Sequence, residues 1–320
     1  MSESRRQVTI PPRLSGVRLD KALAELLDLP RSRVSRLWSD GLIRTTDNRQ
    51  LKPAQAATSG EKFVIDIPQP VPLIVTAESL TQLDIIFEDD AIMVINKPAG
   101  LIAHPSPGTG DQPTLADLLH HARPNLKEAR YSDSEGDRRR AGLVHRLDKD
   151  TSGVMVVAKT AAALETLKQA FKERRVQKTY QAVCAGDPGD QLVDEPLGRH
   201  PRRWWLRSVI ATGKPAQTEF TVLKRGQLYR QPASLVQAAP RTGRTHQIRV
   251  HLLHLGCPIL GDSRYQTDAS RELTRLANVP RLLLHAAELT ITHPQTGKVM
   301  TFTADLPADI SAVAAAITSK

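Results

Sequence analysis

The apolar residues near the N-terminus follow the spacing of a short helix. They recur at intervals of three and four residues, the period of an amphipathic helix, at Leu19, Ala22, Leu23, Leu26 and Leu27. Farther along, the stretch EKFVIDIP alternates between apolar and polar residues, which is typical of a strand. Together with a second helix between them, these elements predict a compact unit over residues 16–75, preceded by a tail of residues 1–15.

The second predicted helix begins at Pro30 and has two unlike faces. Its apolar stripe consists of Val34, Leu37 and Trp38. Three basic residues lie on its other side, namely Arg31, Arg33 and Arg36. This pattern leaves two interpretations open. The basic face is either a solvent-exposed surface of a small helical cap or a surface that contacts nucleic acid.

A stiff linker is predicted at Pro68, Pro70 and Pro72, so that a second domain occupies residues 76–320. Two apolar runs around Asp89 and Asp90 predict a hairpin that ends at Gly100. The stretch TLADLLHHA predicts a helix capped by Thr114. Residues 127–140 are almost free of apolar side chains, which favours an exposed or partly disordered insert.

The rest of the chain predicts more strands than helices. GVMVVAK and QKTYQAVCAG are expected strands on either side of a helix, TAAALETLKQAFKERR. Four more strands are expected at QTEFTVL, ASLVQAA, ELTITHP and KVMTFTA, together with a helix HQIRVHLLHLG that ends before Gly256. Because these elements follow no alternating strand–helix rhythm, we predict an α+β fold with a mixed, mainly antiparallel sheet.

Charge and cysteine content narrow the class of protein. The 320 residues include 44 Lys and Arg against 34 Asp and Glu, a net charge of +10, which suggests a polyanionic partner or a basic surface kept for solubility. The two cysteines, Cys184 and Cys257, have neither metal-ligand spacing nor the number needed for a disulfide framework. No apolar run is long enough for a membrane span. These features predict a soluble cytoplasmic monomer.

One short stretch, LVHRLDKDTSGVMVVAK, concentrates charge around Gly153. A calcium loop beginning at Asp148 would need an acidic residue at its twelfth position, where the chain has Lys159, so that reading fails. A phosphatase nucleophile would fit the Asp148 and Asp150 spacing, but no apolar run precedes them and no acidic pair follows. The phosphohydrolase therefore stays a minor alternative, which metal dependence would reveal.

Two further stretches combine charge with turn residues. In QKTYQAV, Tyr180 lies in a predicted strand beside Lys178, and in RTGRTHQIRVH several arginines surround His246. Each residue has an ordinary structural alternative. Asp148 is compatible with a helix cap or turn, Tyr180 with a half-buried strand aromatic, and Arg249 with a surface cation.

Taken together, these three stretches resemble the three sequence motifs of the RluA/RluD-type family of RNA pseudouridine synthases. The resemblance spans about residues 80–305 and extends to NKPAGLIAHP, TGKPAQTEF, GCPILGD and RLLLHAAELTITHPQTG. The N-terminal unit resembles the S4 RNA-binding module. VDEPLGRHP is similar to the synthase D of large-subunit ribosomal RNA, whereas the C-terminal third is as similar to the dual-specificity type. The resemblance implies the pseudouridine synthase fold in the catalytic domain.

The resemblance also implies a reaction without a cofactor or metal, in which a uridine of structured RNA is isomerised to pseudouridine. By motif position, Asp148 is the essential carboxylate, Arg249 its cationic partner and Tyr180 the aromatic that stacks on the target base. Arg146 fills the space of the flipped-out uridine. We expect the substrate to be bound by His145, Arg146, Arg241, Arg244 and His246.

The expected substrate is the 23S RNA of the large ribosomal subunit or its precursor. The same chemistry on transfer RNA, dual specificity, and a catalytically silent RNA-binding protein stay as alternatives. The stretch GRHPRRWWLRS joins guanidinium and aromatic planes, which both stack on unpaired bases. RNA-binding residues are therefore predicted at two places, namely Arg31, Arg33 and Arg36, and Arg202, Arg203 and Trp204.

Overall fold

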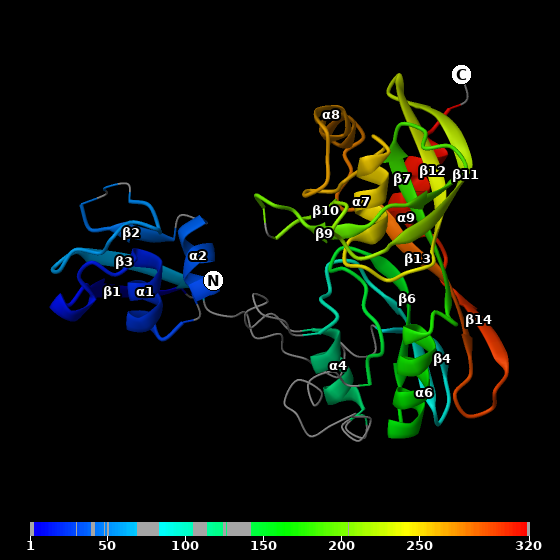
Figure 1. Cartoon of the computed structure of the whole chain (residues 1–320), viewed down its shortest axis with the longest axis horizontal. Coiled ribbons are helices and arrows are strands. Elements are labelled where there is room, and N and C mark those ends of the chain that lie inside the picture. The colour runs from blue at the N-terminus through cyan, green and yellow to red at the C-terminus, as the bar shows by residue number, and fades with distance from the viewer. Residues whose placement is uncertain are drawn as a thin grey trace. The chain divides into compact units, whose positions relative to one another are not determined.

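The computed structural model describes residues 3–29, 31–39, 42–47, 49, 51–68, 83–104, 114–123, 126, 142–203 and 205–318. The chain divides into two compact units, an N-terminal unit that contains residues 3–68 and a C-terminal unit that contains residues 83–104 and 114–318 (Figure 1). Within these ranges, none of the helices combines the length and the apolar character that a membrane crossing requires.

The N-terminal unit is a three-stranded antiparallel sheet with two helices. Its elements are β1 Glu3–Thr9, the short 3-10 helix Pro12–Leu14, α1 Leu19–Leu27, α2 Arg31–Ser39, β2 Ile43–Thr45 and β3 Lys62–Pro68, and the strand order is β1-β3-β2. Leu19 and Leu23 of α1 pack with Val34 of α2 and with Phe63 and Ile65 of β3 in one buried cluster. The two helices and the strand predicted here are confirmed.

The predicted tail of residues 1–15 is wrong for the part that the structure describes. Strand β1 lies within it and pairs with β3 over its whole length, from Glu3 opposite Pro68 to Thr9 opposite Lys62. The sequence ESRRQVT holds one apolar residue, so an edge strand of this composition leaves no hydrophobic alternation to detect.

The C-terminal unit is built on one large sheet. Its strands are β4 Asp84–Glu88, β5 Ile92–Lys97, β6 Ser152–Ala158, β7 Gln177–Ala185, β8 Gln191–Asp194, β11 Gln217–Leu228, β12 Gln231–Pro240, β13 Leu284–Thr292 and β14 Val299–Thr303. The order is β4-β5-β6-β13-β7-β12-β11-β8, and β14 pairs with β13. Among the described strands only β6 and β13 run parallel, which confirms the mixed, mainly antiparallel sheet. A separate hairpin pairs β9 Leu197–Arg199 with β10 Arg207–Val209.

Helices cover both faces of this sheet. They are α4 Leu115–Ala122, α6 Ala161–Lys172, α7 Gln247–His254, α8 Asp268–Leu276 and α9 Ala308–Ala315. Figure 1 shows α7, α8 and α9 gathered around β7 and β12, and α6 beside β4 and β6. Because side chains alternate along β6, Val154 and Val156 pack with α6, whereas Met155 and Val157 pack with α4 on the other face. Strand β6 is thereby buried along its whole length.

Gly153 explains why the sheet can hold its parallel pair. It has a φ of +117°, and a Cβ at this position would stand 2.2 Å from the backbone oxygen of Ala286 in β13. Only glycine fits this approach of two backbones. The charged stretch that precedes it is thereby anchored at the centre of the sheet.

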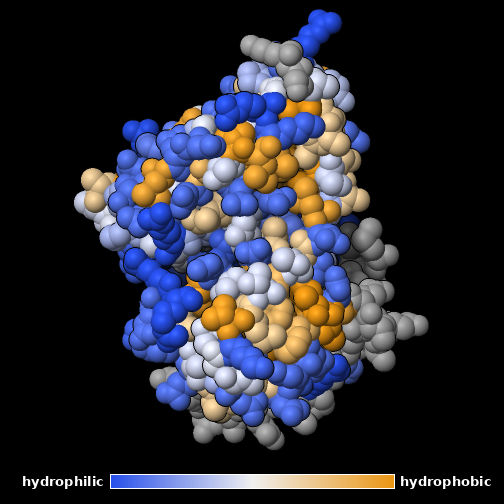
Figure 2. Space-filling model, turned by 90° about the vertical axis from the view of Figure 1, so that its right-hand side faces the viewer, coloured by the Kyte–Doolittle hydropathy of each residue, from blue (hydrophilic) through white to orange (hydrophobic). Residues whose placement is uncertain are grey.

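Most elements that the sequence predicted in this unit are confirmed. The hairpin around Asp89 is β4 and β5, and Thr114 caps α4 in a capping box with Asp117. Pro70, Pro72 and the insert of residues 127–140 lie outside the described residues. Helices α8 and α9 were not predicted. The surface drawn in Figure 2 carries hydrophobic residues in separate groups between hydrophilic ones.

Candidate active site

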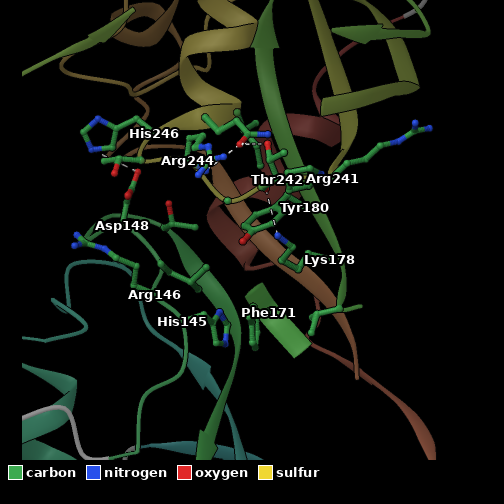
Figure 3. A pocket seen from close by; sticks show the side chains of 18 of the residues that line it. His145, Arg146, Asp148, Phe171, Lys178, Tyr180, Arg241, Thr242, Arg244 and His246 are labelled. Carbon is green, nitrogen blue, oxygen red and sulfur yellow. Dashed lines mark hydrogen bonds and ion pairs between the residues drawn. The ribbon is translucent and has the colours of Figure 1, made fainter. Parts of the chain in front are cut away.

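A pocket of about 500 Å³ lies where four segments of the C-terminal unit meet. They are residues 144–151 before β6, residues 171–176 at and after the end of α6, strand β7, and residues 240–249, which lead from β12 into α7. Figure 3 shows side chains from these segments turned toward one another. All three stretches singled out in the sequence therefore reach one pocket, although about a hundred residues separate the first from the last.

Asp148 and Arg249 form an ion pair in this pocket. The Nη1 of Arg249 donates a hydrogen bond of 3.0 Å to Oδ2 of Asp148, whose side chain keeps 19% of its surface exposed. The backbone N–H of Thr151 donates to the carbonyl of Asp148, which closes the turn that carries the carboxylate. Arg249 is buried, so the surface-cation alternative for this residue is wrong.

Arg249 is itself held in place by a second carboxylate. Its Nε and Nη2 donate to Oδ2 and Oδ1 of Asp262 at 2.7 and 2.8 Å, the two-pronged geometry that is specific to arginine. Asp262 is buried and also accepts from the backbone N–H groups of Arg264 and Tyr265. The remaining guanidinium nitrogen, Nη1, thereby points toward Asp148.

The electrostatic surroundings keep Asp148 ionised. Burial alone would raise the pKa of its carboxyl, but the positive charges of His246, when protonated, and of Arg249 hold this pKa below its usual range. Burial, however, lowers the pKa of His246 to about 4, so this ring is neutral near pH 7. We therefore attribute the stabilisation of the Asp148 anion at neutral pH to Arg249 and, at a smaller level, to Arg146.

Tyr180 and Lys178 line the same pocket because they lie two residues apart on β7, so that their side chains leave the sheet on one face. Burial, and then the charge of Asp148, raises the pKa of the Tyr180 phenol, which keeps it protonated. Burial, and then Arg174, lowers the pKa of Lys178 to about 8. Tyr180 also packs against two core clusters, so it is both a structural aromatic and a wall of the pocket.

His145 is fixed by contacts within the protein. Its ring stacks on Phe171 with centroids 4.6 Å apart, and its Nε2 accepts a hydrogen bond from the backbone N–H of Val156. Burial lowers the pKa of His145 to about 3, which leaves the ring neutral. This histidine therefore tethers the loop of Asp148 to β6 and α6, while its ring lines the pocket.

The segment that enters α7 is held by Gln247. Its Oε1 accepts from the hydroxyl of Thr242 and from the backbone N–H of Arg244, and its amide donates to Gln217 and Thr218 in β11. Three arginines of the site differ in their surroundings. Arg241 pairs with Glu219 at 3.0 Å, Arg244 donates to the carbonyl of Pro215, and Arg146 is exposed and lines the pocket.

A buried lysine supports the loop that carries Asp148. Lys97 is fully buried at the end of β5, and its ammonium donates to the carbonyls of Pro98, Leu101 and Lys149 at 2.7, 2.9 and 3.2 Å. Burial lowers the pKa of Lys97 to about 7, although Asp150 and Asp148 oppose this shift. Because Lys149 follows Asp148 directly, this contact joins the NKPAGL turn to the loop that carries the carboxylate.

The residues predicted to bind RNA away from the pocket lie in α2 and between β9 and β10. Arg31 is half exposed and donates to Asp20, while the side chains of Arg33 and Arg36 lie outside the described residues. Arg202 and Arg203 are exposed in the turn between β9 and β10, where their backbone N–H groups donate to Nδ1 of His200. Trp204 lies outside the described residues.

Four residues of the site were missed by the sequence analysis. Asp262, Tyr265, Gln247 and Lys97 were given no role, although each fixes a segment of the pocket. The quoted stretches GCPILGD and NKPAGLIAHP contain two of them, which is the signal that could have found them. Among the described residues, no group of three or more His, Cys, Asp and Glu could hold a metal ion.

Arginines, a lysine and an aromatic side chain surround the fixed Asp148 anion in this pocket. Such a pocket suits an enzyme that acts on a nucleic acid, because the cations attract phosphates and the aromatic ring can stack on a base. The family model of RNA pseudouridylate synthases matches residues 91–254. The ribosomal large subunit pseudouridine synthase D of Nitrosomonas europaea is 37% identical over 99% of this chain and 89% of its own, and that of Vibrio parahaemolyticus is 38% identical over 94% and 91%.

A solved structure agrees with this likeness. Human RNA pseudouridylate synthase domain containing 1 is 27% identical, with a TM-score of 0.57, and the match covers 73% of this chain and 88% of that one. The chain belongs to the RNA pseudouridine synthase family and has its enzymatic activity. The resemblance of the three motifs to this family is thereby confirmed, and the silent RNA-binding protein and the phosphohydrolase are set aside.

Proposed function

We propose that this synthase isomerises uridines in the RNA of the large ribosomal subunit. The observation that carries the proposal is the match to two relatives named for that substrate, which extends over 94% and 99% of the chain. The excess of 10 positive charges and the arginines around the pocket suit an RNA ligand.

Asp148 is proposed as the catalytic carboxylate of this reaction. In pseudouridine formation the N-glycosidic bond at N1 breaks, the uracil turns and a C–C bond forms at its C5. C5 then loses its proton and N1 gains one, so the product is an isomer of the substrate. An ionised carboxylate acts on the sugar or the base while the glycosidic bond is open. The ion pair with Arg249 supports this role, because it keeps Asp148 charged and fixes its position.

The other walls of the pocket suit a single flipped-out base. Tyr180 and Asp148 both line the pocket, and so does Arg146, whose exposed side chain extends away from Tyr180 in Figure 3. We propose that Tyr180 stacks on the uracil and that Arg146 occupies the space the nucleotide leaves in the RNA. Flipping costs a few kcal/mol, and least in a single-stranded loop, which favours a loop uridine as target.

The substrate can be tested by mapping pseudouridines in ribosomal and transfer RNA of a strain that lacks this gene. We expect one or more pseudouridines of large-subunit RNA to disappear and to return with the wild-type gene. The Asp148→Asn gene serves as the matched control, because it supplies the RNA-binding surface without the proposed carboxylate. Loss of pseudouridine from transfer RNA alone would contradict the ribosomal assignment and favour the transfer RNA alternative.

We propose that the N-terminal unit, residues 16–75 together with β1, is an S4-like RNA-binding module. Two buried aspartates of this unit each bind two exposed arginines. Asp20 pairs with Arg18 and Arg31, and Asp66 pairs with Arg5 and Arg44. Each aspartate orders two cations and neutralises one, so each group keeps a surplus positive charge on the surface.

Replacing Arg31, Arg33 and Arg36 with glutamine in the full chain should weaken RNA binding without changing turnover of bound RNA. If all three arginines meet phosphate, a plot of log affinity against log salt should become shallower by about 2. Arg271→Gln in α8, which removes one exposed cation from the C-terminal unit, is the control. An unchanged salt slope in the triple variant would contradict phosphate contacts by this helix.

A further inference from the structure

His246 has a backbone conformation that residues with a side chain rarely adopt. It precedes α7 directly and lies in the left-handed region, with φ 59° and ψ 22°. Its ring is mostly buried, and its Nε2 stands 3.8 Å from Oδ2 of Asp148. Strain of this kind persists where the surroundings impose it and is common at functional sites. The contacts that hold this ring therefore bear on the chemistry of Asp148.

The other ring nitrogen of His246 contacts Tyr265. The hydroxyl of this tyrosine lies 2.7 Å from Nδ1, and the two rings meet edge to face with centroids 5.4 Å apart. Tyr265 is itself buried. Its backbone N–H donates to Asp262, and the guanidinium of Arg249 lies over its ring at 4.9 Å. The position of the phenol is thus fixed by contacts other than the one with His246.

A second hydrogen bond decides which way the phenolic proton points. The backbone N–H of Arg207 in β10 donates to the Tyr265 oxygen at 2.8 Å. The phenol has a single proton, and Nδ1 of His246 is the acceptor within hydrogen-bond distance of its oxygen among the described residues, so we direct the proton there; the opposite arrangement would leave a buried hydroxyl proton without an acceptor. Nδ1 then accepts, so the neutral ring carries its proton on Nε2, the nitrogen that faces Asp148.

The charged groups around the ring are consistent with a neutral imidazole. Asp148 and Asp262 favour its protonation, whereas Arg249, Arg264 and, above all, burial oppose it, and the balance lowers the pKa of His246 to about 4. A neutral ring with the opposite tautomer would turn a lone pair toward the Asp148 carboxylate. That arrangement is repulsive, and it removes a donor from the place where the sugar and base must lie.

We propose that Tyr265 is a positioning residue, which holds His246 in the tautomer that presents an Nε2–H donor beside Asp148. Neither residue needs to exchange a proton with the substrate for this. At 3.8 Å from Oδ2 of Asp148 this N–H faces the carboxylate without a hydrogen bond to it, so it is available to donate one fixed hydrogen bond to a nucleotide that binds there. This inference rests on the proposed role of Asp148, but the state of the ring can be measured without any RNA.

The first test is the ¹⁵N spectrum of the histidine rings in the full-length wild-type protein at neutral pH, with His246→Gln used only to assign the signals. We expect His246 to show a protonated Nε2 and an unprotonated, hydrogen-bonded Nδ1. A protonated Nδ1 overturns the proposal whatever the activity of the enzyme. The same spectrum would be unaffected if the assignment of the RNA substrate were wrong.

The second test is Tyr265→Phe, with Tyr229→Phe as the control, since Tyr229 is exposed in the turn between β11 and β12. In Tyr265→Phe we expect a second ring state of His246, protonated on Nδ1, and a kcat lowered about tenfold with KM nearly unchanged. A loss of stability with an unaltered His246 spectrum and normal kcat would reduce Tyr265 to a packing residue. If the variant does not fold, the wild-type spectrum alone decides.

Discussion

Replacing Asp148 with asparagine is expected to reduce pseudouridine formation by at least about a thousandfold, a loss typical of removing a catalytic acid, base or nucleophile. Asparagine keeps the size of the side chain and an acceptor for Arg249, but it has no charge. The fold should survive, because Arg249 keeps both of its hydrogen bonds to Asp262. RNA binding should be unchanged or tighter, since the pocket loses a negative charge that faces a polyanion.

The measurement is single-turnover pseudouridine formation on saturating RNA, together with the affinity of each variant for the same RNA. Asp150→Asn is the matched control, because Asp150 is exposed two residues away and is not one of the residues that line the pocket. It should turn over at nearly the wild-type rate. Turnover of Asp148→Asn within tenfold of wild type would remove this residue from the chemistry.

The sequence could predict which segments meet in the pocket because each carries its signal locally. HRLDKDTSG, the QKTYQAV strand and the RTGRTHQIRVH stretch stand out by charge beside turn residues, and the family resemblance joined them. The structure shows why such segments can meet. Gly153 permits the contact between β6 and β13, and β13 pairs with β7 on its other side.

The supports of the site could not be predicted in the same way. Helix α7 buries Gln247, Arg249 and His251, and each satisfies its polar atoms through a partner on another segment. A helix with polar residues on its buried side has no amphipathic pattern. Its sequence therefore does not show whether an arginine on it is buried or exposed. The stretch GCPILGD marked the segment of Asp262, but only the tertiary fold shows that this carboxylate is the partner of Arg249.

The same argument applies to His145. As part of a charged motif it predicts a substrate contact, and its ring lines the pocket, but the same ring is also held by Phe171 and by the backbone N–H of Val156. A motif identifies residues that the site needs, without separating those that touch the ligand from those that hold the loop. That separation follows from hydrogen-bond partners, which depend on segments distant in sequence.

Arg249→Met is expected to lower both stability and turnover. Arg249 is buried between two carboxylates, so its removal leaves Asp262 as a buried anion without its cation and should destabilise the fold by about 3–5 kcal/mol. The double variant Arg249→Met/Asp262→Asn separates this effect from catalysis. Asparagine can still accept from the backbone N–H groups of Arg264 and Tyr265, so part of the stability should return while turnover stays low.

The pH dependence distinguishes a partner of Asp148 from a merely structural arginine. In the wild type, the cations around Asp148 outweigh its burial and lower its pKa. Without Arg249 the burial prevails, so this pKa rises and a higher pH is needed to ionise the carboxylate. The acidic limb of the pH–rate profile should therefore move upward by about 1–3 pH units, in the single and in the double variant alike.

Arg249→Lys completes the series. An ammonium keeps the charge, so the acidic limb should move less than in Arg249→Met, but it cannot bind Asp262 with two prongs and reach Asp148 at the same time. Its turnover should lie between those of the wild type and Arg249→Met, with RNA affinity nearly constant across all variants. If the acidic limb of Arg249→Met stays where it is in the wild type, Arg249 does not set the ionisation of Asp148, and its role is confined to holding α7 to the segment of Asp262.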